Sequence, residues 1–355
     1  MSANEVNVGL VIGQLSAGGA EAQLALLARA LNGTRHRPLV YCVSAAGEPI
    51  GRELRADGIE VRLFPGAPPG RVAALARAFA ADRVDIVHAW LFIANSYAWL
   101  ANCGRRPLIT SARNCKRQGG LHDFLNRFAF RGSKRVVANS RQVKQYIESN
   151  YGAPADRIDV ICNGVDVDRF CPGEGASAPL VVGIGRLVPQ KDPELFVRVA
   201  ARVAERLPEV RFAFVGEGPL RALVEAAIVQ HGLSARFSLP GETRDVAAVL
   251  QRATLFWLTS HWEGLPNVVL EALACGVPVV AADVGGTREL VRSGVEGELV
   301  ADGDVDAFVR HSVELLADGT RRASYGARAR ERALEFSTQR MVERMVGLYE
   351  QVGAS

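Results

Sequence analysis

Short apolar runs with the character of buried strands alternate with helical patterns along most of this 355-residue chain. Between the first two runs, apolar residues recur at helical spacing. This alternation is typical of a parallel sheet that is covered by helices on both faces. The predicted strands are Val6–Ile12, Pro38–Val43, Ile86–His88, Leu108–Thr110 and Arg135–Ala138 in the first half, and Leu180–Ile184, Val210–Val215, Ala235–Leu239, Thr254–Leu258, Val277–Ala281 and Glu298–Val300 in the second.

The alternation pauses once, over residues 163–177, which are rich in Gly, Pro and Asp. Such a composition is typical of a linker between domains. We therefore predict two doubly wound α/β domains, residues 1–172 and 173–337, with functional loops at the carboxyl ends of their strands and a cleft between the two sheets. A last helix over residues 338–355 follows a break in the pattern and could pack on either domain.

The composition is that of an ordinary globular protein, with 48% hydrophobic and 23% charged residues. The net charge of +4 fits an acidic ligand or a membrane surface without requiring either. Six cysteines without a CxxC spacing indicate reduced thiols. We expect neither a secretory signal nor a membrane-spanning helix, and a cytoplasmic protein is the simplest interpretation.

The segment HWEGLPNVVLEALACGVP, residues 261–278, combines two carboxylates with the start of a helix. Pro266 suits the first turn of a helix, where free N–H groups and the helix dipole favour an oxygen-rich ligand. Glu271, one turn further on, could accept hydrogen bonds from two vicinal hydroxyls such as those of a ribose. Glu263 lies in the loop before the helix. The alternative is that Glu271 is a solvated helix residue and Glu263 a cap.

Three further loops contain glycine after a predicted strand. Gly18 and Gly19 precede a helix, where backbone N–H groups can approach an anion. Arg186 and Lys191 flank a glycine turn, and two cations there suit a diphosphate, although both could be surface cations. Gly216 belongs to a GxG that lacks the rest of a dinucleotide fingerprint, so a plain tight turn is the favoured interpretation and a ligand contact is the alternative.

Five motifs stand in order along the chain: GGAE at 18–21, NGVD at 163–166, GRLVPQK at 185–191, GEGP at 216–219 and EGLPNVVLE at 263–271. This set resembles the retaining glycosyltransferases of family 4 (glycosyl transferases group 1), which have the GT-B fold and use nucleotide-sugar donors. The resemblance extends from residue 6 to about residue 350, and the 263–280 segment is its most specific part.

The resemblance implies a role for each matching position. Arg186 and Lys191 would neutralise the donor diphosphate, and the Gly18 and Gly19 amides would contact the phosphates from the other domain. Glu271 would hold the ribose hydroxyls. The donor-sugar contacts would come from Glu263 and from the backbone of Gly264, Leu265, Pro266 and Asn267, with Gly216 also on the donor side. The resemblance further implies an acceptor domain, 1–172, onto which helix 338–355 returns, and a donor domain, 173–337.

Many relatives carry a histidine after the strand that corresponds to Leu108–Thr110. Here the positions that follow are Arg113 and Asn114, and we expect one of them to serve the acceptor side. His88 ends an earlier predicted strand and is a candidate catalytic residue, although a histidine at a strand end is more often structural. The DxD patterns at 166–168, 302–304 and 304–306 lie away from the predicted site loops, so we expect no essential metal and no cofactor besides the nucleotide sugar.

The stretch 105–144 holds eleven Lys or Arg residues and a single acid, Asp123, together with several phenylalanines. A basic helix with an apolar face can bind an anionic bilayer, so we expect attachment to the inner face of the plasma membrane. The alternative is that the phenylalanines are core residues and the cations are solvated. The stretch contains no recognisable nucleic-acid-binding module.

The resemblance therefore implies a retaining, metal-independent transferase that moves a sugar, most simply from a UDP-sugar, to a glycan or lipid-linked acceptor in surface polysaccharide or glycolipid assembly. Two alternatives remain. One is a nucleotide-sugar epimerase of the same architecture, and the other is a non-catalytic protein that binds a nucleotide sugar. A NAD-dependent dehydrogenase is disfavoured, because no GxGxxG follows a predicted strand.

Overall fold

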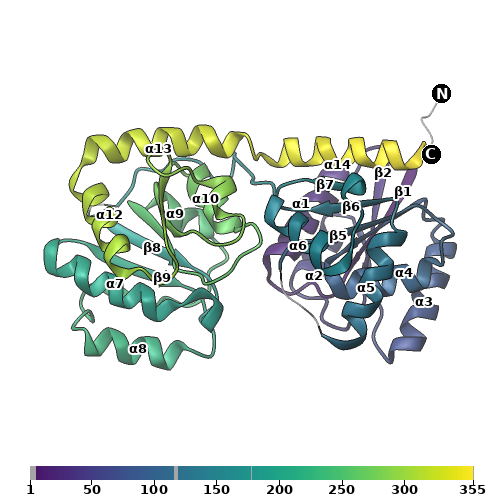
Figure 1. Ribbon diagram of the computed structural model, residues 1–355, viewed down its shortest axis with the longest axis horizontal. Coiled ribbons are helices and arrows are strands. Elements are labelled where there is room, and N and C mark those ends of the chain that lie inside the picture. Colours follow the sequence, from purple (N-terminus) through teal and green to yellow (C-terminus); the bar gives the residue numbers. More distant parts are fainter. Residues whose placement is uncertain (1–4, 116–118, 177, 355) are drawn as a thin grey trace. The chain divides into compact units, whose positions relative to one another are not determined.

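A computed structural model describes residues 5–115, 119–176 and 178–354 (Figure 1). The chain divides into two compact units. Unit 1 comprises residues 1–164 together with 338–355, and unit 2 comprises residues 165–337. Each unit is a parallel sheet with helices on its faces, which is the architecture that the alternation of strands and helices predicts.

Unit 1 contains a seven-stranded parallel sheet with the order β3-β2-β1-β4-β5-β6-β7. Its strands are β1 (Val6–Ile12), β2 (His36–Cys42), β3 (Glu60–Leu63), β4 (Ile86–Trp90), β5 (Leu108–Ala112), β6 (Arg135–Ala138) and β7 (Ile158–Val160). The helices are α1 (Gly19–Leu31), α2 (Ile50–Ala56), α3 (Pro68–Ala81), α4 (Leu91–Asn102), α5 (Gly120–Gly132), α6 (Arg141–Tyr151) and α14 (Thr338–Gly353), with a 3₁₀ turn, η1 (Ala155–Arg157).

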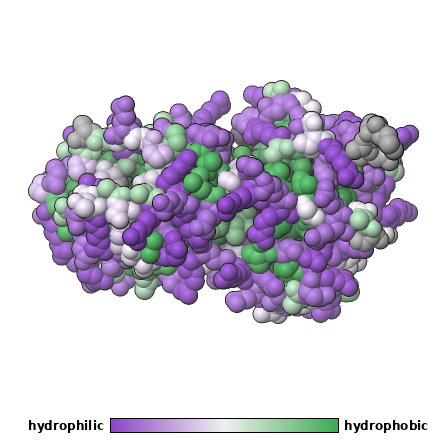
Figure 2. All heavy atoms as spheres, turned by 90° about the horizontal axis from the view of Figure 1, so that it is seen from above, coloured by the Kyte–Doolittle hydropathy of each residue, from purple (hydrophilic) through white to green (hydrophobic). Residues whose placement is uncertain are grey.

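The C-terminal helix α14 is part of unit 1, although 173 residues of unit 2 precede it in the chain. It is amphipathic, and its buried face includes Met345, Leu348 and Tyr349, which share a core cluster with β1, β4 and α1. The outer faces of α13 and α14 are mostly hydrophilic (Figure 2). Among the described residues, the helices are too short or too polar to cross a bilayer.

Unit 2 contains a six-stranded parallel sheet with the order β10-β9-β8-β11-β12-β13. Its strands are β8 (Leu180–Ile184), β9 (Arg211–Val215), β10 (Phe237–Ser238), β11 (Leu255–Leu258), β12 (Val279–Ala282) and β13 (Gly297–Val300). The helices are α7 (Pro193–Arg206), α8 (Arg221–Gln230), α9 (Val246–Gln251), α10 (Asn267–Ala274), α11 (Thr287–Leu290), α12 (Val305–Ala317) and α13 (Gly319–Leu334), with a 3₁₀ turn, η2 (Pro189–Lys191).

Aromatic residues form the centre of the unit 2 core. Phe196, on α7, meets Trp257 of β11 with 4.9 Å between ring centroids and packs edge-on against Phe214 of β9. All three side chains are almost completely buried. This packing fixes α7 against the centre of the sheet and thereby positions the loop that leads into α7.

The boundary between the units falls at residues 164/165, earlier than the 172/173 boundary predicted from composition. The stretch that looked like a linker is held on unit 2 by Arg330 of α13. Its guanidinium donates to the carbonyls of Val167 (2.9 Å) and Phe170 (2.8 Å). The Val165 N–H also donates to the Phe336 carbonyl. Hydrogen bonds to a distant helix, which composition does not reveal, therefore attach the Gly- and Asp-rich segment to unit 2.

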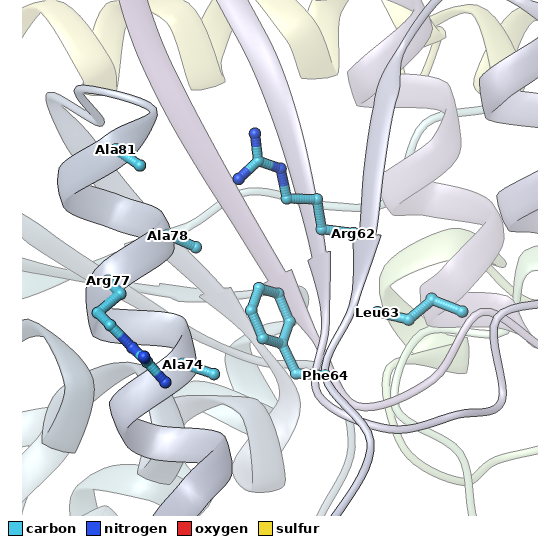
Figure 3. A pocket seen from close by; sticks show the side chains of 7 residues that line it. All are labelled: Arg62, Leu63, Phe64, Ala74, Arg77, Ala78 and Ala81. Carbon is cyan, nitrogen blue, oxygen red and sulfur yellow. The ribbon is translucent and has the colours of Figure 1, made fainter.

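A shallow depression of about 590 Å³ lies between β3 and α3 in unit 1. Figure 3 shows Arg62, Phe64 and Arg77 around it, with three alanines of α3 and Leu63 completing the lining. The Arg62 guanidinium is engaged by Glu60 and Asp82, both at 2.6 Å. Arg62, one of the two cations there, is thus already paired with carboxylates, and we assign this depression no function.

Candidate active site

Four loops of unit 2 follow strands that are neighbours in its sheet. These loops come after β9, β8, β11 and β12, at the carboxyl ends of the strands. Parallel strands bring such loops to one edge, where ligands of open α/β sheets bind. Every unit 2 residue predicted from sequence to bind the donor lies on these loops or on α10 directly after them.

The loops after β8 and β9 interlock through backbone groups. The Leu187 N–H donates to the Glu217 carbonyl (2.8 Å), and the Gly185 N–H donates to the Val215 carbonyl (3.0 Å). Gly216 has φ +148°, and a Cβ atom there would collide with the carbonyl oxygen of Gly185. Gly216 therefore has a steric role that only glycine fulfils without rearrangement. Arg186 is exposed on this rigid loop.

Lys191 ends the 3₁₀ turn η2 directly before α7. Asp192 has φ +41° and caps α7 by accepting from the Leu195 N–H at 3.0 Å. The Lys191 carbonyl accepts from the hydroxyl of Thr259, just after β11 (2.8 Å). This fixed backbone aims the ammonium at the Glu263 carboxylate, with 2.5 Å between Nζ and Oε1. The two side chains are only 18% and 10% exposed, so the ion pair is largely shielded from water.

The backbone around Glu263 is fixed on both sides. The His261 N–H donates to the Gln190 carbonyl (2.9 Å), which joins this loop to η2. The Gly286 N–H donates to the Gly264 carbonyl (2.7 Å). Gly285 has φ +59°, and a Cβ atom there would collide with the Glu263 carbonyl oxygen. The loop that carries Glu263 is thus tied through its backbone to η2 and to the loop after β12. Such fixed positioning is the preorganisation that a binding site requires.

Helix α10 begins at Asn267, with Pro266 as its N-cap in an extended conformation. Its start lies one residue later than the start at Pro266 predicted from sequence. Leu265 and Pro266 are buried, and Asn267 is partly buried. The first turn of α10 therefore presents the dipole's positive end at the same edge as Lys191 and Glu263.

Glu271 lies one turn into α10 and is partly buried. Burial raises the pKa of this carboxyl group to about 7, against the opposing effect of the Arg169 guanidinium. The carboxyl group therefore titrates near neutral pH. When ionised it only accepts hydrogen bonds, which suits a pair of sugar hydroxyls.

Each DxD pattern contains an acid that already has a partner within the protein. Asp166 accepts from the N–H groups of Asp168 and Arg169 in a turn. Asp302 lies 2.8 Å from His261, and Asp304 caps α12. Across residues 5–115, 119–176 and 178–354, no three His, Cys, Asp or Glu side chains are grouped as metal ligands would be.

In unit 1, Gly18 is the N-cap of α1, directly after the loop that follows β1. Gly18 and Gly19 are both exposed and lie at a helix N-terminus. A Cβ atom on Gly18 would collide with the buried carboxylate of Glu21. The Glu21 side chain therefore lies close under this turn and accepts from Gln14 at 3.2 Å.

His88 lies in β4 and is completely buried. Its Nδ1 is 2.7 Å from the Tyr349 hydroxyl of α14, and its Nε2 is 2.7 Å from the Ser111 hydroxyl of β5. Burial lowers its pKa well below the usual value. Both ring nitrogens have partners within the core, so His88 joins β4, β5 and α14, which is the structural role that the sequence left open; its catalytic role stays a prediction.

Arg113 follows β5 and is almost completely buried, whereas Asn114 is only partly buried. The guanidinium carbon of Arg113 lies 3.7 Å from the centre of the Trp90 ring, and Nη1 donates to Asn163 Oδ1 at 2.8 Å. Burial lowers the Arg113 pKa to about 9. The two residues predicted to serve the acceptor side thus differ in burial, and Arg113, the charged one, is enclosed by the protein.

The basic stretch 105–144 is split between core and surface. Phe130 is completely buried, whereas Phe124 and Phe128 of α5 are exposed. The alternative interpretation, that the phenylalanines are core residues, is therefore confirmed for Phe130 and wrong for Phe124 and Phe128. Two cations of the stretch, Lys116 and Arg117, lie outside the described residues.

Sequence reasoning missed three residues at these edges. Trp262 is 51% exposed directly before Glu263, and an exposed tryptophan in a site loop is a signal that the sequence already contains. Arg169 acts on Glu271, and Trp90 covers Arg113. The last two pairings join residues far apart in the chain, so no local pattern predicts them.

Two family models together match most of the chain: Glycosyltransferase Family 4 at residues 17–169 and Glycosyl transferases group 1 at residues 166–332. The D-inositol 3-phosphate glycosyltransferase of Nocardia farcinica is 32% identical over 75% of this chain and 66% of its own length. The enzyme of the same name from Frankia alni is 36% identical over 58% of this chain and 56% of its own length. The chain thus matches roughly half to two thirds of these relatives' lengths.

Among solved structures, Anabaena HepE in complex with UDP superposes with a TM-score of 0.86 at 24% identity, over 98% of this chain and all of HepE. That likeness shows the fold. With the family models and the relatives, it means that the chain belongs to the group 1 glycosyltransferases, and that its two parallel-sheet units are those of the GT-B fold.

Proposed function

We propose that this protein transfers a sugar from a nucleotide sugar, most simply a UDP-sugar, to an acceptor hydroxyl with retention of configuration. The observation that carries the proposal is the grouping of Arg186, Lys191 and Glu263 on the loops after the adjacent strands β8 and β11, with Glu271 on α10 directly after them. HepE, the Anabaena relative by fold, was crystallised with UDP and with UDP-glucose. UDP as the nucleotide here is inferred from that likeness and from the family.

The chemistry of transfer explains why these residue types are needed. Cleavage of the donor builds negative charge on the departing nucleoside diphosphate. Arg186 is free to bind two phosphate oxygens, and Lys191 can share its protons between Glu263 and a phosphate. The N–H groups at the start of α10 add further donors. A fixed donor of this kind is worth about 3 kcal/mol in a transition state, so we propose that no metal ion is required.

Product analysis tests the proposal. The protein is incubated with a panel of UDP- and GDP-sugars and acceptors, with and without a chelator. A glycoside with the anomeric configuration of the donor supports the proposal. A free epimerised sugar would identify an epimerase, and binding without any product would identify a non-catalytic nucleotide-sugar-binding protein.

The acceptor is a separate part of the proposal. The curated relatives are named for inositol 3-phosphate, but the alignments span only part of their lengths. We propose a glycan or lipid-linked acceptor in surface polysaccharide or glycolipid assembly.

We further propose that the protein reaches this acceptor from an anionic membrane surface, which it contacts through α5. This helix exposes Leu121, Phe124 and Phe128 beside the exposed cations Arg127 and Arg131. Apolar side chains next to cations suit the interface of an anionic bilayer.

Vesicle co-sedimentation at low salt tests the membrane contact. The wild-type protein is expected to sediment with phosphatidylglycerol vesicles and less with phosphatidylcholine vesicles. The double variant Phe124→Ser, Phe128→Ser is expected to lose most of that binding. Leu223→Ser, at an exposed leucine of α8 in unit 2, is the matched control and should bind as wild type does. Equal binding by the double variant would contradict the assignment to α5.

A further inference from the structure

Four polar or aromatic residues of unit 1 meet at one edge of its sheet. Trp90 ends β4, Arg113 follows β5, Asn139 follows β6, and Asn163 lies just beyond β7. These four strands are consecutive neighbours in the sheet. The residues therefore gather at the carboxyl edge, which is where an open parallel sheet binds ligands.

Arg113 is the charged member of this group and is only 6% exposed. One face of its guanidinium lies against the Trp90 ring, 3.7 Å from the ring centre, and Nη1 donates to Asn163 at 2.8 Å. Within the described residues, Nε and Nη2 have no hydrogen-bond partner and are closed to water. These two nitrogens form one edge of the guanidinium, the fork that binds two oxygens of a carboxylate or phosphate.

Among the described residues, no carboxylate acts as a counter-charge to this cation. The ionisable groups that act favourably on Arg113 are the Tyr349 hydroxyl and the Cys162 thiol, and neither is a carboxylate. Although burial lowers the Arg113 pKa to about 9, the group stays charged at neutral pH. A buried cation whose donors are unmet is costly, and an anion at the fork would remove that cost.

Two further polar atoms at the same edge are also buried without a partner in the part of the chain that the structure describes. They are Trp90 Nε1, a donor, and Asn139 Oδ1, an acceptor. The Asn139 amide nitrogen is used to hold the Arg113 carbonyl, at 3.3 Å. Unmet donors and an unmet acceptor next to a lone cation are the features expected of a polar site that lacks its ligand.

We propose that the Nε/Nη2 edge of Arg113 binds an oxyanion, a carboxylate or a phosphate, carried by a small molecule that docks on unit 1. Since both nitrogens are closed to water here, binding includes a local opening of the residues around them. That this anion belongs to the sugar acceptor rests on the proposed transferase function. The oxyanion site itself does not, and its test uses neither a nucleotide nor turnover.

The test uses the full chain with Arg186→Ala and Lys191→Ala, which remove the cations of unit 2 that would also bind phosphate. Inorganic phosphate, acetate and chloride are titrated in turn while the ¹H–¹⁵N signal of the Arg113 Nε–H is followed. That signal is identified by its absence in Arg113→Gln. Phosphate or acetate is expected to move the signal to saturation, and chloride is not. A response to phosphate alone or to acetate alone would identify which oxyanion class fits.

Calorimetry on variants completes the test. Arg113→Gln is expected to weaken oxyanion binding by more than about tenfold, and Arg113→Lys, which keeps the charge without the fork, by about tenfold. Arg106→Gln is the matched control and should bind as its parent does, because its Nε already donates to the Val84 carbonyl at 2.8 Å. If Arg113→Gln does not fold, two measurements remain: the NMR titration of the protein that keeps Arg113, and the calorimetry of Arg113→Lys. A signal that no oxyanion moves, or equal binding by the lysine variant and its parent, would overturn the proposal.

Discussion

The two units hold their most enclosed site cations in opposite ways. In unit 2, Lys191 has the Glu263 carboxylate 2.5 Å away, and both belong to loops tied together through their backbones. In unit 1, the neighbours of Arg113 within the described residues are the Trp90 ring and the Asn163 amide, and none of them is a carboxylate. Both cations lie at the carboxyl edge of a parallel sheet, so the difference comes from the neighbours that each fold supplies.

The contrast is between a cation in unit 2 that already has a negative partner and a cation in unit 1 that lacks one among the described residues. A shielded ion pair costs much less than a shielded single charge, because each partner replaces part of the other's lost hydration. Unit 2 therefore has a balanced ion pair, and under the proposed function a diphosphate would bind there by sharing Lys191 with Glu263. Unit 1 has an unbalanced site that is satisfied only when a ligand brings the negative charge.

The strongest test of the contrast is activity. Lys191→Ala is expected to lower kcat/KM of glycosyl transfer by about 100- to 1,000-fold, because it removes a fixed charge from the departing diphosphate. Lys134→Ala, at an exposed lysine of unit 1, should leave kcat/KM unchanged. Steady-state kinetics with a UDP-sugar make the measurement, and near-normal activity of the first variant would remove Lys191 from the site.

A second test compares the glycine loops of the two units. Gly216→Ala is expected to destabilise the protein by about 2–4 kcal/mol, because the new methyl group meets the Gly185 carbonyl in a conformation that alanine rarely adopts. Gly13, after β1, has no atom within 4 Å of an added Cβ. Gly13→Ala should therefore shift stability by less than about 0.5 kcal/mol. Urea unfolding monitors both, and similar midpoints would mean that the unit 2 loops are not interlocked.

A third test exchanges each cation for a neutral residue of similar length. Lys191→Met leaves Glu263 shielded and unpaired, so we expect a loss of about 1–3 kcal/mol. Arg113→Met removes a lone buried charge, and we expect no loss or a gain of about 1 kcal/mol. The urea midpoint should fall for Lys191→Met and should stay unchanged or rise for Arg113→Met. A comparable loss in both variants would show that Arg113 is already balanced.

The smallest expected effect is a pH dependence of donor binding. Because Glu271 has a pKa of about 7, its carboxyl group is mostly ionised at pH 8 and mostly protonated at pH 6. UDP-glucose, whose diphosphate does not titrate in this range, should bind about tenfold more weakly at pH 6 than at pH 8. Arg113, with a pKa of about 9, keeps its charge throughout. Calorimetry on Glu271→Gln should show a flat profile, and an equal slope in this variant would exclude Glu271 as the titrating group.

Sequence alone predicts the strands of unit 2 better than those of unit 1. All six strands of unit 2 lie at predicted runs, whereas β3 and β7, the two edge strands of unit 1, are missed. Glu60–Leu63 alternates charged and apolar residues over only four positions, and Ile158–Val160 has three residues. Runs that short carry too little periodicity, and their strand state is fixed by pairing with a neighbour.

Sequence predicts the candidate site residues with the same limit: local properties can be predicted, and contacts between distant residues cannot. The types of residue at Arg186, Lys191 and Glu271 indicate their chemistry, because charge and position after a strand are local properties. The pairing of Lys191 with Glu263 spans 72 positions, and the burial of His88 depends on Tyr349, 261 positions away. Whether a polar side chain at a strand end faces a ligand or the core depends on such distant partners, which is why sequence could not show that His88 lies in the core.

The most direct test of the central claim, that the unit 2 loops hold a nucleoside diphosphate, is calorimetric titration with UDP in the presence of a chelator. The account predicts micromolar binding by the wild-type protein and a loss of at least about 100-fold in the Arg186→Ala, Lys191→Ala double variant. Equal binding by both proteins, or no UDP binding by the wild type, would contradict it.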